Sequence, residues 1–427
     1  MQKFSLKGIW NFVLDHNNNG IEQNYHKQEN QPYLDDKIKI FLPHCLNTEP
    51  QDKLEDYSGV VWYFKTFRIP PHFIGNKIYL HFDRIAQSAI IFINGKKVGK
   101  INGAFIPFEF DITEEFKDRF EEHFLAVRID TSEESRRYPI EPNINEYYGI
   151  FGDVFVRFEE KIALISHFMD TKLHFNPNNS VEYAELSISL SFLNNGNEDY
   201  TGKINLELLQ DNVSIIDTER DFDILQNNSR LMKIVINLEN PELWSPENPN
   251  LYDLSMRVSN NLGTIIREEK TIGIREIGLK DDQISLNGTL MEIHAKPFKI
   301  DLLESGYVLP EHYIFKQMQE LKNQGINTIY PNQGTFSPLI FKLASYFGFL
   351  ILANLPILSL SLSEKSTFFK IYINDVNLEP CLALYTCNRE IKRNAEINRI
   401  LLSYEKLFLE IDQTHLFVNS ENLRIDE

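Results

Sequence analysis

Carboxylates supply the acid–base chemistry that this sequence could carry, and the candidates in its C-terminal third are Glu390, Glu379, Asp301 and Glu304. Two carboxylates that share a site can divide the roles of general acid and nucleophile. Arg389 directly precedes Glu390, and a paired guanidinium favours the ionised carboxylate and lowers its pKa. A general acid needs a raised pKa to keep its proton near neutral pH. Pairing with Arg389 would instead lower the pKa of Glu390 and make it a poorer general acid. The alternative is a solvated carboxylate in the first turn of a helix, which the helix dipole stabilises.

The other acidic candidates and His294 are expected to have no catalytic role. Glu379 precedes a predicted strand, and Asp301 and Glu304 follow another one, so all three are expected to be surface loop acids. His294 lies in an apolar strand pattern. We predict that it is a core histidine with satisfied hydrogen bonds.

Other catalytic and metal-binding patterns are absent from the sequence. It contains no glycine-rich phosphate loop, no GxSxG motif and no HExxH motif. Cys45, Cys381 and Cys387 form no CxxC pair and have no histidines nearby. We therefore predict no metal site, no cofactor and no disulfide framework.

Length and charge limit the kinds of partner. A chain of 427 residues is too long for one core and indicates several domains. Its net charge of −18 repels nucleic acids and anionic membrane surfaces. The first residues lack the apolar run of a signal peptide, and no stretch of the sequence is long and apolar enough to span a membrane. The sequence thus predicts a cytoplasmic protein with neutral partners.

The first two thirds of the chain have the pattern of β-sheet domains. Residues 79–82 and 89–93 are apolar and rich in β-branched side chains, and Asn94-Gly95 after the second run is a strong hairpin signal. Residues 186–192 alternate with a period of two, as a strand with one buried face requires. Short strands with frequent turns favour β-sandwiches.

Past residue 276, strand and helix patterns alternate. Strands are predicted at residues 290–293, 326–330, 349–352, 382–385 and 416–418. Helices are predicted at residues 310–324, from Ser337 to Gly348, and around 397–411. This alternation indicates a parallel sheet with helical crossovers. A full eight-unit (β/α) barrel needs roughly 250 residues, so this region is long enough for only about half of one.

Several N-terminal segments carry a resemblance to a known family. They are Leu6-Lys7-Gly8-Ile9-Trp10-Asn11-Phe12, Tyr57-Ser58-Gly59-Val60-Val61-Trp62-Tyr63, Phe92-Ile93-Asn94-Gly95-Lys96-Lys97-Val98-Gly99, Pro107-Phe108-Glu109-Phe110-Asp111-Ile112-Thr113 and Gly149-Ile150-Phe151-Gly152-Asp153-Val154. In this order they resemble the sugar-binding jelly-roll domain of glycoside hydrolase family 2, the family of β-galactosidases, β-glucuronidases and β-mannosidases. Gly152 stands where that family usually has an arginine.

The rest of the chain resembles the other domains of the same family. The segment from Asn240 to Tyr252, followed by Gly273-Ile274-Arg275, resembles the end of its immunoglobulin-like domain. Leu286-Asn287-Gly288 and two later segments, residues 325–329 and 346–352, resemble framework segments of its catalytic barrel. The resemblance implies a jelly roll, an immunoglobulin-like sandwich and a truncated (β/α) barrel, at residues 1–160, 161–275 and 276–427.

The resemblance fails at positions where the family binds its sugar. Tyr330 replaces an arginine, and Asn354 replaces the carboxylate that closes strand three. An Asn-Arg-His sequence after strand one is replaced by Ala295-Lys296-Pro297-Phe298. Each change removes polar or charged recognition at the strand ends, where barrel enzymes keep their sites.

The acid/base motif is only partly retained. Tyr385-Thr386-Cys387-Asn388-Arg389-Glu390 aligns with the family pattern Trp-Ser-x-Gly-Asn-Glu. The resemblance implies that Glu390 is the acid/base, while Arg389 replaces an asparagine that contacts the sugar's 2-hydroxyl. A retaining glycosidase also needs a nucleophile about 5–5.5 Å away. The family supplies it from strand seven, and this sequence ends before a sixth strand, so no residue here can be assigned that role.

Two N-terminal residues are further binding candidates. Asp130 and Arg137 lie where the family's jelly roll approaches the mouth of the barrel, although a solvated loop is the alternative. Three tryptophans could stack on sugars, but they lie in framework segments where core packing is favoured: Trp10, Trp62 and Trp244.

Three classes of function remain open. The first is a pseudo-glycosidase that binds carbohydrate or protein without cleavage. The second is a retaining, β-galactosidase-like enzyme whose barrel is completed by another chain or copy, because a half barrel has open edges and an exposed apolar interior. The third is an enzyme with a rearranged site. Losses at several upstream positions favour the first, with substrate-binding roles assigned to Asp130, Arg137, Arg389, Asn354 and Tyr330.

Overall fold

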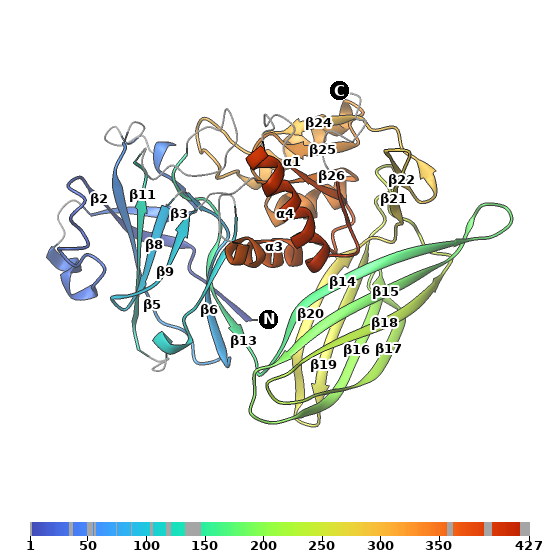
Figure 1. The fold of residues 1–427 in the computed structure, drawn as a ribbon, viewed down its shortest axis with the longest axis horizontal. Coiled ribbons are helices and arrows are strands. Elements are labelled where there is room, and N and C mark those ends of the chain that lie inside the picture. Colours follow the sequence, from blue (N-terminus) through green and yellow to red (C-terminus); the bar gives the residue numbers. More distant parts are fainter. Residues whose placement is uncertain are drawn as a thin grey trace. The chain divides into compact units, whose positions relative to one another are not determined.

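The computed structural model describes residues 2–33, 37–48, 54, 57–73, 75–86, 88–102, 106–116, 121–132, 147–356, 362–387 and 395–418 (Figure 1). The chain forms two compact units. Unit 1 comprises Met1–Glu160, Ile300–Leu309 and Pro356–Phe368. Unit 2 comprises Lys161–Lys299, Pro310–Leu355 and Phe369–Glu427.

Unit 1 contains a jelly-roll β-sandwich (blue to teal in Figure 1). One sheet has the order β3 (Ile38–Leu42), β2 (Gly8–Asp15), β5 (Val60–Phe67), β11 (His123–Asp130), β8 (Ser88–Ile93) and β9 (Lys96–Asn102). The second has the order β1 (Gln2–Ser5), β13 (Val154–Glu159), β6 (Lys77–Phe82) and β10 (Phe108–Asp111). A small sheet joins β4 (His44–Cys45), β12 (Gly149–Ile150) and β7 (Ile85–Ala86), and 3₁₀ helices span Gln28–Tyr33, Leu46–Thr48 and Thr113–Phe116.

Side-chain patterns explain this sandwich. The strands predicted at residues 79–82 and 89–93 are present in β6 and β8. Asn94 and Gly95 both have positive φ, 50° and 80°, which is the backbone that a tight type I′ hairpin requires. Trp10 and Trp62 are 1% and 0% exposed, so the prediction that they pack in cores is confirmed.

The first part of unit 2 is an immunoglobulin-like sandwich (green to yellow in Figure 1). One sheet has the order β14 (Ile162–Phe175), β15 (Val181–Asn194) and β18 (Ser229–Glu239). The other has the order β17 (Val213–Ile224), β16 (Tyr200–Gln210), β19 (Tyr252–Asn260) and β20 (Gly263–Ile272). Residues 186–192 lie in β15, where every second side chain is buried, as their alternation predicts.

The second part of unit 2 is a partial (β/α) barrel. Its parallel sheet has the order β24 (Ala295–Phe298), β25 (Thr328–Pro331), β26 (Leu350–Leu355), β27 (Leu382–Cys387) and β28 (Leu416–Phe417). The helices are α1 (Glu311–Asn323), α2 (Pro338–Phe347), α3 (Leu362–Val376), which crosses the boundary between the units, and α4 (Ala395–Ile411). A small antiparallel sheet before the barrel consists of β21 (Ile277–Lys280), β22 (Gln283–Leu286) and β23 (Thr289–Leu290).

Helix ends follow the predicted signals. Pro338 is the first residue of α2, Ser337 is its N-cap, and Gly348 ends it with a left-handed φ of 74°. Gly325 follows α1 with a φ of 77°. In the described residues, no helix combines the length and apolar character needed to cross a membrane.

Two elements differ from the sequence prediction. The first parallel strand is β24, at Ala295–Phe298, instead of residues 290–293. Pro297 argues against a strand here, because proline lacks the N–H that a central strand needs. The structure accommodates Pro297 because β24 is the outermost strand of the described sheet. Helix α3 was missed although Phe369, Ile373 and Val376 recur at helical spacing and are buried.

Candidate functional site

The carboxyl ends of the parallel strands place three neutral side chains on one face of the sheet. Asn354 of β26 is in register with Thr386 of β27. The Tyr385 ring lies 4.8 Å from the ring of Phe408 in α4, so Tyr385 faces the helices and its neighbour Thr386 faces the opposite side. The register of β25 with β26 puts Tyr330 on this same side. All three side chains, those of Tyr330, Asn354 and Thr386, are neutral.

This face is more closed than the sequence predicts. Leu352 and Leu384 are 3% and 0% exposed, and Asn354 and Thr386 are also buried. The expected exposed apolar interior is therefore wrong for β26 and β27. No hydrogen bond joins the Asn354 side chain to any described residue, which leaves an amide that an incoming ligand could use.

The remaining candidates at this end are not placed with Asn354. Glu390, Arg389 and Arg137 lie outside the described residues. Asp301 and Glu304 belong to a turn of unit 1 in which Leu302 N donates to Gly306 O at 2.9 Å. Tyr307 anchors this turn, because its ring lies 5.0 Å from that of Tyr147 and 5.2 Å from that of Phe151.

Two expectations about single residues are wrong. Glu379 is partly buried and accepts a 2.7 Å hydrogen bond from Ser345 Oγ. Burial raises the pKa of Glu379 despite this bond and two nearby lysines. His294 is exposed, lies before β24, and its Nε2 is 3.5 Å from Glu292 Oε1. The prediction for His294 failed because the first strand was misplaced. The prediction for Glu379 failed because its contact with Ser345 before β27 has no local sign in the sequence.

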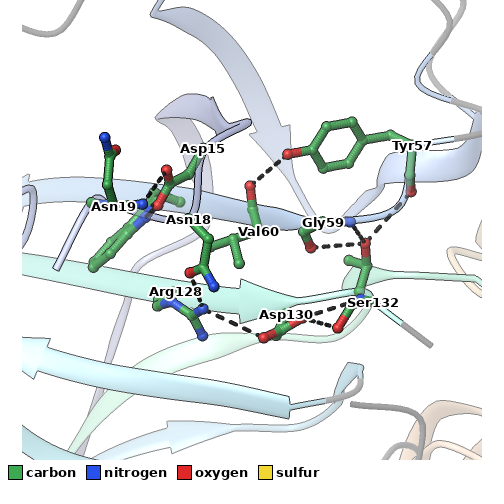
Figure 2. Close-up of polar contacts among 12 residues, drawn as sticks. Asp15, Asn18, Asn19, Tyr57, Gly59, Val60, Arg128, Asp130 and Ser132 are labelled. Carbon is green, nitrogen blue, oxygen red and sulfur yellow. Dashed lines mark hydrogen bonds and ion pairs between the residues drawn. The ribbon is translucent and has the colours of Figure 1, made fainter. Parts of the chain in front are cut away.

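Asp130, the last residue of β11, belongs to a hydrogen-bonded cluster in unit 1 (Figure 2). Its Oδ1 accepts bonds from Ser132 N at 3.1 Å and Ser132 Oγ at 2.7 Å. Its Oδ2 lies 3.4 Å from Arg128 Nη2, which also donates to Asn18 Oδ1 at 2.6 Å. These contacts tie Asp130 to its own strand and to the loop after β2, while its role in binding stays a prediction.

Asp15 holds the other side of this cluster (Figure 2). Its carboxylate accepts bonds from Asn19 N at 3.0 Å, Gly20 N at 2.9 Å and Trp62 Nε1 at 3.1 Å. A Cβ on Gly20 would come within 2.6 Å of Trp62 Nε1, so only glycine fits there. The loop after β2 is thus fixed by backbone donors to one carboxylate.

Trp244 and the Gly-Ile-Arg motif join the sandwich to the barrel within unit 2. Trp244 Nε1 donates to Ser345 O of α2 at 2.9 Å, and its side chain is fully buried. A Cβ on Gly273 would lie 2.6 Å from Pro380 Cβ, so the chain approaches β27 too closely for any other residue. Arg275 donates from Nε to Pro380 O at 2.5 Å and from Nη2 to Leu382 O. The motif therefore fixes the start of β27.

Two cavities of unit 2 lie at the amino ends of the parallel strands, opposite the predicted site. The larger, of about 640 Å³, is lined by residues that include Glu247, Glu292, His294 and Lys322. The smaller, of about 320 Å³, is lined by residues that include Arg275, Asn377 and His415. Sequence reasoning noted Arg275 only as part of a motif. It missed Asn377 and His415, because nothing in their local sequence indicates a cavity. The described residues contain no cluster of three potential metal ligands.

Comparisons with known proteins agree with this architecture. Residues 44–159 match the glycosyl hydrolase 2 galactose-binding domain-like family, and residues 166–275 match the glycosyl hydrolases family 2. A β-galactosidase of Thermoanaerobacter pseudethanolicus is 29% identical over 306 residues, which cover 70% of this chain and 40% of that protein. A β-glucuronidase of Formosa agariphila is 25% identical over 346 residues, which cover 73% of this chain and 34% of that protein.

Solved structures show the same fold. A glycosyl hydrolase family 2 member from Bacteroides cellulosilyticus has a TM-score of 0.82 at 21% identity, covering 98% of this chain and 57% of that one. Bacteroides uniformis β-glucuronidase 2, covalently bound to cyclophellitol-6-carboxylate aziridine, has a TM-score of 0.78 at 20% identity, covering 98% of this chain and 52% of that one. This chain thus spans about half the length of those structures. On its two matched domains, its relatives and its fold, the chain belongs to glycoside hydrolase family 2.

Proposed function

We propose that this chain binds carbohydrate, or a protein partner, through a family 2 scaffold without cleaving a glycosidic bond. The observation that supports the proposal is the neutral character of the described side chains at the carboxyl ends of β25, β26 and β27, whereas Arg389 and Glu390 after β27 lie outside the described residues. Tyr330, Asn354 and Thr386 share one face there, and none of them can act as a carboxylate nucleophile or acid. Retaining hydrolysis needs two carboxylates on either side of the scissile bond.

The ligand class follows from the relatives and from the side chains that remain. The relatives named above are β-galactosidases and β-glucuronidases, which supports a β-glycoside as the bound molecule. Asn354 offers an unused amide, which can both donate to and accept from sugar hydroxyls. Neutral side chains of this kind suit binding better than cleavage, because they cannot stabilise the positive charge of an oxocarbenium-like transition state.

A second candidate is a retaining β-galactosidase-like enzyme whose barrel is completed by a partner chain or a second copy. It is favoured by β28, a strand of two residues that pairs only with β27 among the described strands. Its free edge presents backbone groups that another strand could bind. In this case Glu390 would supply the acid/base, and the nucleophile would come from outside this sequence.

Hydrolysis of a panel of aryl β-galactosides, β-glucuronides, β-mannosides and β-glucosides tests the proposal. The proteins compared are the wild type, Glu390→Gln and the matched control Glu379→Gln, which changes an acid before β27. We expect no turnover by any of the three. Turnover by the wild type and by Glu379→Gln that is lost in Glu390→Gln would refute the proposal and support the second candidate.

A further inference from the structure

The smaller cavity of unit 2, here called the amino-end cavity, is a hollow with unusually polar walls. Its lining comes from the edge strand β14, the Gly-Ile-Arg segment, and the loops before β27 and β28. Its volume of about 320 Å³ is near the lower limit of the range for small-molecule sites, roughly 300–1,000 Å³. In a barrel this end normally serves stability, so several ionisable side chains around a hollow call for an explanation.

Arg275 brings a buried positive charge to the cavity. The residue is 9% exposed, and the two hydrogen bonds of its guanidinium go to backbone carbonyls. Burial lowers its pKa to about 10, so it remains charged at neutral pH. No carboxylate of a described residue forms an ion pair with it. Nη1 forms no hydrogen bond with any described residue, so it can donate to a ligand oxygen.

His415 is held with one ring nitrogen available. Its Nδ1 lies 2.9 Å from Asp412 Oδ2 and 3.0 Å from Thr414 Oγ1. Asp412 is fully buried and also accepts bonds from the backbone nitrogens of Thr414 and His415. Because these contacts fix the imidazole through Nδ1, Nε2 has no hydrogen-bond partner among the described residues and can contact a ligand.

Asn377 adds a buried acceptor without a donor. Its Nδ2 donates to His167 O, while its Oδ1 has no partner among the described residues. Asn377 is 3% exposed. A buried acceptor that lacks a hydrogen bond costs on the order of 1–3 kcal/mol, which a ligand hydroxyl could recover.

The charges around the cavity exclude simple ions as the natural occupant. The lining combines two basic side chains, Arg275 and Lys172, with three acidic ones, Asp170, Glu276 and Glu379, so both signs of charge face the hollow and the acids outnumber the bases by one. A phosphate or carboxylate would be repelled by these acids, and a cation would be repelled by Arg275. Hydroxyl groups, by contrast, donate to carboxylates and amides and accept from guanidinium and imidazole. A neutral molecule with many hydroxyls can therefore form hydrogen bonds with both the acidic and the basic side chains of the lining.

We propose that the amino-end cavity binds a neutral sugar of monosaccharide size, a hexopyranose, through Arg275, Asn377 and His415. Apolar side chains such as Met169, Ile277 and Leu378 are available to contact the C–H face of such a ring. The site lies at the opposite end of the parallel strands from Asn354. It is therefore independent of the proposed function and needs no catalytic residue.

Sugar binding to variants tests the proposal. Lys172 is an exposed residue of β14 that lines the cavity, so Lys172→Trp should close the site without disturbing a core. Lys233→Trp, at an exposed position of β18 outside the cavity, is the matched control. Asn354→Ala reports on the carboxyl end. The probes are D-galactose, D-glucose and D-mannose, with inorganic phosphate as the anionic comparison, followed by saturation-transfer NMR and calorimetric titration.

We expect the wild type and Lys233→Trp to bind at least one of the sugars at the amino-end cavity with similar affinity. Asn354→Ala should keep this site, even where it loses a separate sugar site at the carboxyl ends of the strands. Lys172→Trp should bind the sugar at the amino-end cavity about tenfold more weakly or not at all, since a bulky ring would occupy the cavity. Three results would overturn the proposal: no sugar binding by the wild type, loss of binding only in Asn354→Ala, or binding of phosphate in preference to every sugar. Loss only in Asn354→Ala would still support the proposed function, so the two ideas fail separately.

Discussion

The Asp130 cluster of unit 1 and the amino-end cavity of unit 2 both gather charged and amide side chains, but they use them differently. In the first, the carboxylates of Asp15 and Asp130 accept hydrogen bonds from neighbouring loops and from Arg128. In the second, Asn377 Oδ1 is buried without a partner, and Arg275 Nη1 and His415 Nε2 form no hydrogen bond with a described residue. The carboxylates of the first cluster are satisfied and fix the local fold, although the buried Arg128 Nε has no hydrogen-bond partner among the described residues. Unused groups around a cavity, by contrast, are typical of a binding site.

The same contrast separates the two ends of the parallel sheet. The carboxyl ends, where this family keeps its chemistry, carry the neutral Tyr330, Asn354 and Thr386 on a largely buried face. Among the described residues, the amino ends carry ionisable side chains that line two cavities. The following predictions test whether each region is structural or functional, in order of decreasing effect.

Arg275→Ala should produce the largest loss of stability. It leaves the carbonyls of Pro380 and Leu382 without donors at the start of β27, which we expect to lower the free energy of unfolding by about 4 kcal/mol. Urea denaturation followed by tryptophan fluorescence measures this. Arg267→Ala, which removes an exposed ion pair with Glu269, should change it by less than about 1 kcal/mol. Equal effects of the two substitutions would show that Arg275 has no structural role.

His81 should make the stability of unit 1 depend on pH. Burial alone would lower its pKa, but Asp83 at 2.9 Å and Glu109 at 3.1 Å outweigh burial and raise it to about 9. The stabilisation is fully present below the unfolded pKa of about 6.5 and is lost as pH rises through about 9. We expect a loss on the order of 2–3 kcal/mol between pH 6 and 10.

Denaturation curves of the wild type and His81→Gln across this pH range measure the His81 effect. The neutral glutamine cannot titrate, so its curve should lack the loss above pH 7. If both proteins lose stability in parallel, the pH dependence belongs to other groups and His81 is not charged in the folded protein.

Asp130→Asn should cost about 1 kcal/mol of stability, and sugar binding by the variant tests the binding role that the sequence predicts for Asp130. The substitution keeps the shape but weakens the bonds from Ser132 and the contact with Arg128. Thermal unfolding and the NMR binding assay measure the two effects. A large loss of sugar affinity with normal stability would make Asp130 a ligand-binding residue. The Asp130 cluster would then be a binding site like the amino-end cavity.

Asn354→Ala should have the smallest effect on stability, within about 1 kcal/mol, because its amide makes no hydrogen bond to a described residue. Thermal unfolding checks this. A marked stabilisation would indicate that the amide is retained at a cost for binding, which would sharpen the case for a ligand at the carboxyl ends.

The sequence predicts the architecture well because its signals are local. Asn94-Gly95 and the alternation of residues 186–192 determine their hairpin and strand without help from distant residues. The errors arise where tertiary packing decides the outcome. Pro297 concealed β24, which is tolerated only at the outside of the described sheet. Glu379 was taken for a surface acid because its contact with Ser345, 34 residues away, has no local sign.

The candidate site was predictable only in part. Tyr330, Asn354 and Thr386 were placed on one end of the sheet by alternation of strands and helices and by family resemblance. The cavity residues were not, since Arg275, Asn377 and His415 come from three segments that meet only in the folded chain. Their unused atoms are a property of packing, which sequence patterns do not contain.

The central claim is that this chain has no working glycosidase nucleophile, and intact-protein mass spectrometry tests it most directly. Retaining enzymes form a covalent intermediate through a carboxylate. We would incubate the wild type with cyclophellitol aziridines of glucuronate and galactose configuration, using a retaining β-glucuronidase and a retaining β-galactosidase as positive controls. The account predicts an unchanged mass for this chain. A stoichiometric mass increase by one inhibitor molecule, mapped to a single carboxylate, would contradict it.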